Sequence, residues 1–128
     1  MKNLTIEATD ITPAVDFNAD TQVLRITGES YPENVAMFFN PVIVWLEEFL
    51  AADNDRSILM EIELTMFNSS TSKVLWDMVY ALNEAAPEEA SIVVNWRYHE
   101  LNDLVEEFGE DLQEDNEALT VKMVPITD

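Results

Sequence analysis

The sequence contains no cysteine and very little glycine or histidine. Without cysteine, disulfide bonds, thiolate metal sites and cysteine nucleophiles are excluded. The two glycines, Gly28 and Gly109, are too few for a phosphate-cradling loop or a dinucleotide-binding fingerprint. The single histidine, His99, excludes a metal site built from several histidines. We therefore expect no metal site and no cofactor.

Positive charge is also scarce, because 6 Lys and Arg residues stand against 26 Asp and Glu residues, for a formal net charge of −20. A field that negative repels phosphate backbones and anionic lipid headgroups. We therefore expect the protein to bind neither nucleic acid nor a membrane. No apolar run reaches the ~20 residues that span a bilayer, and the N-terminal residues lack the apolar region of a secretory signal. These features favour the cytoplasm.

The pattern of apolar residues predicts an α/β protein. The chain has 128 residues, 48% of them apolar, which fits one folded domain over its whole length. Alternating apolar residues predict an antiparallel hairpin whose second strand covers Val23–Thr27 and ends at Gly28. Further strands are predicted at Ser57–Met66, Ser91–Trp96 and Leu119–Met123, with helices between them. The order β-β-α-β-α-β-α-β implies right-handed crossovers and a mixed β-sheet with helices packed on it.

The first helix is predicted to begin at Ser30, as N-cap, with Glu33 as its capping-box partner. Its periodicity continues to about Ala52, and residues 53–56 are predicted to form a loop. Pro41 lies inside this helix and should kink it or mark a loose first turn.

The apolar surface of this helix is wider than one core face needs. Beside the main stripe, a second stripe consists of Phe38, Trp45 and Phe49. Two interpretations remain open: the second stripe is a protein–protein patch, or the helix is buried on two sides.

A polar, hydroxyl-rich cluster lies between the strand ending at Met66 and the next helix: Asn68, Ser69, Ser70, Thr71 and Ser72. Functional groups gather at this end of the strands in open α/β sheets. Either one of these residues is the N-cap and the others are polar filler, or one hydroxyl is a phosphoacceptor. A phosphate here would meet backbone N–H groups and the positive end of the helix dipole. Lys73 would pair with such a phosphate or lie over the helix, which is predicted to end near Pro87.

The third helix combines an apolar stripe with a strongly acidic surface. The stripe consists of Leu101, Leu104, Val105, Phe108 and Leu112. Between Glu100 and Glu117 there are many Asp and Glu residues and no Lys or Arg. These carboxylates do not follow a calcium-loop spacing. A solvated face, or a docking surface for a basic partner, is therefore favoured over a metal site.

A small hydrolase is the enzymatic alternative. Ser69 or Ser70 as nucleophile would need His99 as its base, and His99 follows the strand Ser91–Trp96 closely enough to approach the same rim. The sequence offers no glycine-lined oxyanion hole, and nothing selects a pair of carboxylates for acid–base work. We therefore expect the protein not to be an enzyme.

Five blocks of the sequence resemble those of the SiaC family of bacterial regulatory phosphoproteins: Glu29–Asn34, Trp45–Leu50, Phe67–Lys73, Val94–Tyr98 and Glu106–Asp111. They occur in the family's order across nearly the whole chain. The resemblance implies a STAS-like fold, related in architecture to anti-sigma-factor antagonists.

The resemblance also implies a partner switch. A Ser/Thr kinase of the histidine-kinase-like ATPase type would phosphorylate the hydroxyl that follows Asn68, and a PPM-type phosphatase would remove the phosphate. The unphosphorylated form would bind and activate a GGDEF-domain diguanylate cyclase, which raises cyclic di-GMP and favours biofilm or aggregation. By position the acceptor is Ser69, where the family usually has threonine, and Ser70 or Thr71 remain alternatives. A competing hypothesis is an anti-sigma-factor antagonist that binds an anti-sigma kinase.

Two groups of residues are expected to surround the switch. Its neighbours in the chain are Asn68, Ser70, Thr71, Ser72 and Lys73. The recurrence of the block Ser30–Asn34 in the family pattern implies a loop near the phosphosite. This loop and the second apolar stripe of the first helix supply the residues expected to contact a partner: Tyr31, Pro32, Glu33, Asn34, Phe38, Trp45 and Phe49.

Overall fold

The computed structural model describes residues 1–52, 57–86 and 91–127, which form one mixed sheet and three helices. The strands are β1 (Leu4–Ile6), β2 (Ala14–Asn18), β3 (Val23–Ser30), β4 (Ile58–Phe67), β5 (Ile92–His99) and β6 (Thr120–Ile126). The helices are α1 (Val35–Ala51), α2 (Ser69–Ala85) and α3 (Asp103–Asp115). The α/β fold is confirmed. Helix α2 ends at Ala85, close to the end predicted near Pro87. The predicted loop at residues 53–56 lies outside the described residues.

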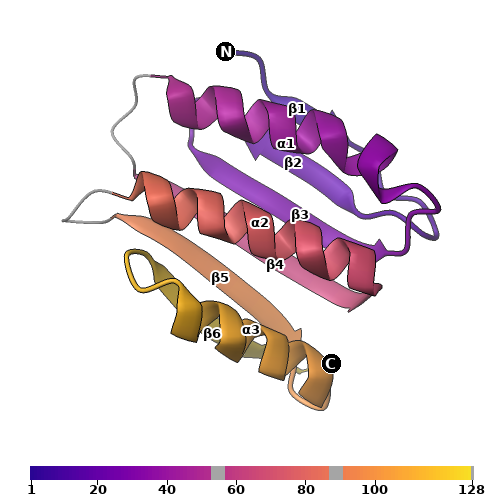
Figure 1. Cartoon of the computed structure of the whole chain (residues 1–128). Helices are drawn as coiled ribbons and strands as arrows, with labels where there is room; N and C mark the ends of the chain where they lie inside the picture. Colours follow the sequence, from indigo (N-terminus) through magenta and orange to yellow (C-terminus); the bar gives the residue numbers. More distant parts are fainter. Residues whose placement is uncertain (53–56, 87–90, 128) are drawn as a thin grey trace.

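All three helices cover the same face of the sheet (Figure 1). The strands follow one another in sequence order, antiparallel from β1 to β3 and parallel from β3 to β6. Right-handed crossovers that always advance in one direction return on one side, so the helices share that side. The other face carries polar side chains, including the ion pairs Arg25–Glu61 at 3.3 Å and Arg97–Glu63 at 2.7 Å. Among the described residues, no helix combines the length and apolar character needed to cross a membrane.

The core beneath α3 is organised around Trp96, which is fully buried. Its Nε1 donates to the Val105 carbonyl at 2.8 Å, and its ring lies 5.3 Å from that of Phe108. Gly109 packs directly on this indole. A Cβ at Gly109 would lie 2.6 Å from Trp96 Nε1 and 2.8 Å from Met123 Cε. The absence of a side chain at Gly109 therefore lets α3 approach β5 closely.

The first strand of the predicted hairpin is two strands in the structure. β1 pairs antiparallel with β2, which in turn pairs antiparallel with β3. The predicted β-β start is therefore β-β-β. The intervening residues turn locally, with the Thr9 N–H donating to the Thr12 carbonyl at 2.9 Å. This turn lets Leu4–Ile6 and Ala14–Asn18 join the same sheet as separate strands.

The prediction that Ser30 caps the first helix is wrong, and so is the end of the hairpin at Gly28. Gly28, at φ +118°, precedes a register shift, after which β3 continues to Ser30 opposite Phe67 of β4. Ser30 is therefore the last residue of β3 and does not cap α1. The N-cap is Asn34, whose side chain accepts from the Met37 N–H at 3.1 Å.

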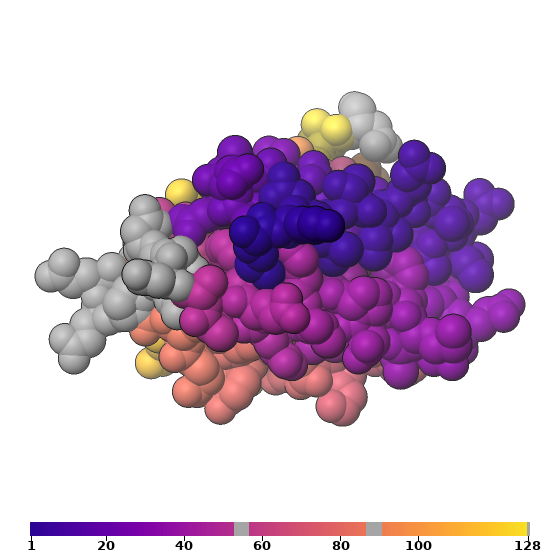
Figure 2. All heavy atoms as spheres, turned by 90° about the horizontal axis from the view of Figure 1, so that it is seen from above, coloured from indigo at the N-terminus to yellow at the C-terminus, as the bar shows by residue number. Residues whose placement is uncertain are grey.

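The second apolar stripe of α1 is largely covered. The rings of Trp45 and Phe49 stack with centroids 4.9 Å apart, and both side chains are buried. Trp45 Nε1 donates to the Lys2 carbonyl at 2.7 Å, and Figure 2 shows the N-terminal residues lying across α1. Burial on two sides therefore holds for Trp45 and Phe49, while Phe38 is half-buried. Helix α1 is continuous from Val35 to Ala51, with Pro41 inside it and not in its first turn.

Candidate functional site

The start of α2 follows directly on the end of β4. Asn68 is the N-cap, and its side-chain oxygen accepts from the Thr71 N–H at 3.0 Å. The backbone N–H of Asn68 donates to the Ser30 carbonyl at 3.1 Å, which ties this corner to β3. The capping role in the hydroxyl-rich cluster therefore belongs to Asn68, and Ser69 and Ser70 are not needed for it.

The structure sorts the four hydroxyl groups of this helix start by exposure. Ser69 and Ser70 are exposed in the first turn. Thr71 is fully buried, with its Oγ1 2.8 Å from Ser30 Oγ. Ser72 is half-buried, and its Oγ donates to the Asn68 carbonyl at 3.2 Å. Because a phosphoacceptor must reach a kinase active site, the burial of Thr71 argues against it and leaves the two serines.

The Ser30–Thr71 contact joins β3 to α2 inside the protein, between residues 41 positions apart. Thr71→Val keeps the shape of the side chain but leaves the Ser30 hydroxyl without this partner, so we expect a loss of about 1–2 kcal/mol in unfolding free energy. Ser30→Ala should cost less, because the Thr71 hydroxyl keeps its hydrogen bond to the Ser30 carbonyl at 3.3 Å. The double variant should cost clearly less than the sum, because it leaves no unpaired hydroxyl. Urea denaturation of the four proteins measures this, and strict additivity would contradict it.

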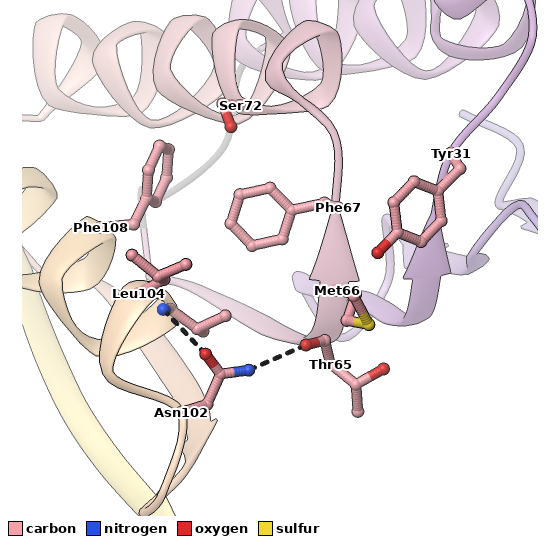
Figure 3. Close-up of a pocket in the computed structure, with 9 residues that line it drawn as sticks. Tyr31, Thr65, Met66, Phe67, Ser72, Asn102, Leu104 and Phe108 are labelled. Atoms are coloured by element: carbon pink, nitrogen blue, oxygen red, sulfur yellow. Dashed lines mark hydrogen bonds between the residues drawn. The ribbon is translucent and has the colours of Figure 1, made fainter.

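A hollow of about 300 Å³ opens beside this corner, between the ends of β3 and β4 and the starts of α2 and α3 (Figure 3). Its lining residues are Tyr31, Thr65, Met66, Phe67, Ser72, Asn102, Leu104, Val105 and Phe108. Within it, the rings of Phe67 and Phe108 meet edge-on at 5.3 Å. The polar groups of Ser72 and Asn102 come from different elements, so the hollow is apolar with a few polar groups on its wall.

Asn102 holds one side of the hollow in place. Its Nδ2 donates to the Thr65 carbonyl at 3.0 Å, and its Oδ1 accepts from the Val105 N–H at 3.2 Å as the N-cap of α3 (Figure 3). One side chain thus links the end of β4 to the start of α3.

The loop after β3 lies where the resemblance places it, beside the start of α2. Tyr31 is half-buried and lines the same hollow as Ser72, while Pro32 is buried. Glu33 and Asn34 are exposed. Of the residues expected to contact a partner, Tyr31 therefore lines the candidate site, whereas Trp45 and Phe49 are buried.

The sequence pattern missed two exposed leucines. It placed Leu101 and Leu104 on the core stripe of the third helix, but their exposed fractions are 79% and 80%. Leu101 precedes α3, which begins at Asp103, and Leu104 in the first turn faces outward. The position of Asn102, a favoured N-cap residue, was the signal that the helix starts after Leu101.

The structure gives no support to a hydrolase that uses His99 as the base for Ser69 or Ser70, because these side chains lie on opposite faces of the sheet. Side chains alternate along β5, so His99 lies on the face opposite to buried Tyr98 and to the helices. Its Nδ1 accepts from the Leu101 N–H at 3.1 Å. Ser69 and Ser70 begin a helix on the other face.

The charged residues near the site engage local partners. Lys73 forms an exposed ion pair with Asp77, one turn further along α2, at 3.3 Å. Burial raises the pKa of Tyr98, and the nearby Glu106 carboxylate, whose Oε2 accepts from the phenol at 3.3 Å, raises it further. Within the described residues, no group of His, Asp or Glu side chains has the arrangement of a metal site.

The fold and the site together define a STAS-like α/β protein with two exposed serines at the start of a helix. Residues 6–126 match the model of the family described as SiaC family regulatory phosphoprotein. The chain belongs to this family, which confirms the resemblance seen in the sequence.

Solved structures and a sequence relative agree with this assignment. A structure of SiaC of Pseudomonas aeruginosa is 31% identical and covers 98% of this chain and 100% of its own, with a TM-score of 0.87. A second match is the structure of the diguanylate cyclase SiaD in complex with its activator SiaC, from the same organism. The identity is 32%, the match covers 96% of this chain and 99% of the matched chain, and the TM-score is 0.87. An uncharacterised protein of Pseudomonas aeruginosa is 35% identical over 115 residues, 90% of each chain.

Proposed function

We propose that this chain is a non-enzymatic partner-switch protein in which phosphorylation of Ser69 controls the binding of a GGDEF diguanylate cyclase. The observation that carries the proposal is the exposure of Ser69 in the first turn of α2, directly after the N-cap Asn68. Backbone N–H groups and the helix dipole favour a phosphate at this position. Such a group adds about −1.5 to −2 charges at one point of the surface.

The cyclase partner follows from the family relationship. SiaC is the activator of the diguanylate cyclase SiaD in the solved complex to which this chain is similar. We infer that the unphosphorylated chain likewise binds and activates a diguanylate cyclase of its own host in the cytoplasm, and so raises cyclic di-GMP. A histidine-kinase-like Ser/Thr kinase and a PPM-type phosphatase would set the phosphorylation state.

The family resemblance, rather than the local charge, favours Ser69 over Ser70 as acceptor, because Lys73 lies one helical turn from either serine. Lys73 lies four residues after Ser69, and residues with this spacing share one face of a helix. The Lys73 ammonium now pairs with the Asp77 carboxylate in an exposed contact, which holds it only weakly. A phosphate on Ser69 would compete with Asp77 for this cation.

Mass spectrometry of the protein purified from its host, with and without phosphatase treatment, tests the acceptor. We expect one phosphate on the peptide that contains residues 68–73, located on Ser69 by fragmentation. The Ser69→Ala variant should lose the modification, and the control Ser70→Ala should keep it. A phosphate on Ser70, or none under any growth condition, would contradict the proposal.

A further inference from the structure

Three large apolar side chains are exposed together at the carboxyl end of the parallel strands. Their exposed fractions are 56% for Met66, 79% for Leu101 and 80% for Leu104. Met66 belongs to the end of β4, Leu101 to the connection after β5, and Leu104 to the first turn of α3. We name Met66, Leu101 and Leu104 the edge patch. They contribute little to the core, and apolar side chains that are exposed together, rather than singly, mark an interaction surface.

The edge patch borders two hollows. Met66 and Leu104 line the hollow of about 300 Å³ drawn in Figure 3. Leu101 and Leu104 line a second, more open hollow of about 500 Å³, which also includes Thr65 and His99. Leu104 therefore stands as a ridge between two depressions. A surface of this shape offers contact area to apolar side chains inserted from a partner.

Hydrogen bonds to neighbouring strands and within the connection hold this surface in its shape. Asn102 lies between the two leucines and bonds both the Thr65 carbonyl and the Val105 N–H. The Glu100 N–H donates to the Ile126 carbonyl at 3.0 Å, and the Asn102 N–H to the His99 carbonyl at 2.8 Å. A binding surface that is ordered in advance loses less conformational entropy when it binds.

The charge around the edge patch determines which partner fits it. Helix α3 contains seven acidic residues and no Lys or Arg, and Glu100 precedes it. A segment with Lys or Arg beside its apolar side chains would be complementary to this surface. A second copy of this chain would instead bring another net charge of −20 against it.

We propose that the edge patch is the docking site of the diguanylate cyclase, and that it receives a cyclase segment with large apolar side chains flanked by Lys or Arg. The inference rests on the proposed function. It also explains how Ser69 acts on binding. Phe67 and Ser72 line the hollow, and Ser69 shares a helix face with Ser72, so a phosphate on Ser69 lies at its rim. Placing a dianion beside an apolar contact is unfavourable because the phosphate loses hydration.

The double variant Leu101→Gln/Leu104→Gln tests the site, with Met37→Gln as a matched control on another exposed apolar residue, 76% exposed in α1. The probe is the host's purified diguanylate cyclase that the unphosphorylated wild-type chain activates. We expect the double variant to bind it at least about 30-fold more weakly and the control to stay within about twofold. Binding of the wild type should also weaken as salt rises. The thermal unfolding temperature of the double variant should equal that of the wild type. If the double variant does not fold, the single variant Leu101→Gln is used for the same binding test.

The possible results separate the two proposals. If the folded double variant binds the cyclase as tightly as the wild type does, the proposed docking site is wrong and the proposed function is unaffected. A wild-type chain that binds none of the host's diguanylate cyclases overturns the proposed function, and with it the occupant named here. If sedimentation shows a wild-type dimer that the double variant abolishes, the patch joins two copies and the proposed occupant is wrong.

Discussion

Phosphorylation of Ser69 is expected to weaken binding of the chain to its diguanylate cyclase by about 30-fold, within the usual range for coupling between two events on one protein. The serine is exposed one residue after the N-cap of α2, and it shares a helix face with Ser72, which lines the hollow. A phosphate there adds negative charge and bound water to a surface that must be desolvated for apolar contact. Isothermal titration with the phosphorylated and unphosphorylated chain measures the ratio.

Variants of the same serine give the matching result in cells. Ser69→Ala should bind the cyclase as the unphosphorylated wild type does, and should keep cyclic di-GMP high whatever the kinase activity. Ser69→Asp should weaken binding less than a phosphate does, because a carboxylate has one charge and two oxygens. Ser70→Ala is the control and should remain switchable. Ser69 is not the switch if both Ser69 variants bind as the wild type and respond to the kinase.

Gly109→Ala should destabilise the protein by about 2–3 kcal/mol, through overpacking in the core. The new methyl group would clash with the indole of Trp96 and lie 2.8 Å from Met123 Cε. The indole cannot move aside without cost, because its N–H donates to the Val105 carbonyl and its ring packs against Phe108. At an exposed helix position, the same substitution would stabilise by roughly 0.5–1 kcal/mol. Whether Gly109→Ala lowers or raises the unfolding free energy therefore shows whether Gly109 is packed against Trp96.

Urea denaturation of Gly109→Ala and of the neighbouring exposed control Glu110→Ala measures this difference. The control should change the unfolding free energy by less than about 0.5 kcal/mol. A shift in midpoint with an unchanged slope would indicate lost native stability. A neutral or stabilising effect of Gly109→Ala would mean that α3 does not approach β5 as closely as the structure has it.

The elements of the fold could be predicted where near neighbours in the chain decide them. Alternation predicted β4 and β5, and apolar periodicity predicted α2 and the buried positions Val105 and Leu112 of α3. The helix start at Asn68 was also predictable, because small polar residues there satisfy N–H groups of the first turn. The prediction of Ser30 as N-cap failed because strand pairing with Phe67 outweighs a local capping motif.

The candidate site was only half predictable. The hydroxyl-rich cluster was found from the sequence, but its sorting into exposed Ser69 and Ser70 and buried Thr71 was not. That sorting depends on Ser30, which is 41 residues away from Thr71. Likewise, Trp45 is covered by the N-terminal segment through Lys2, 43 residues earlier. No local pattern contains such contacts.

The sequence by itself determined the net charge of −20, the α/β order of the central elements, the polar helix start after β4 and the resemblance to the SiaC family. These properties depend on composition or on residues within a few positions of one another. Only the tertiary structure decided which of the hydroxyl groups and apolar side chains reach the surface. Burial is a property of the assembled sheet and helices, because the atoms that exclude water from a side chain come mostly from distant parts of the chain.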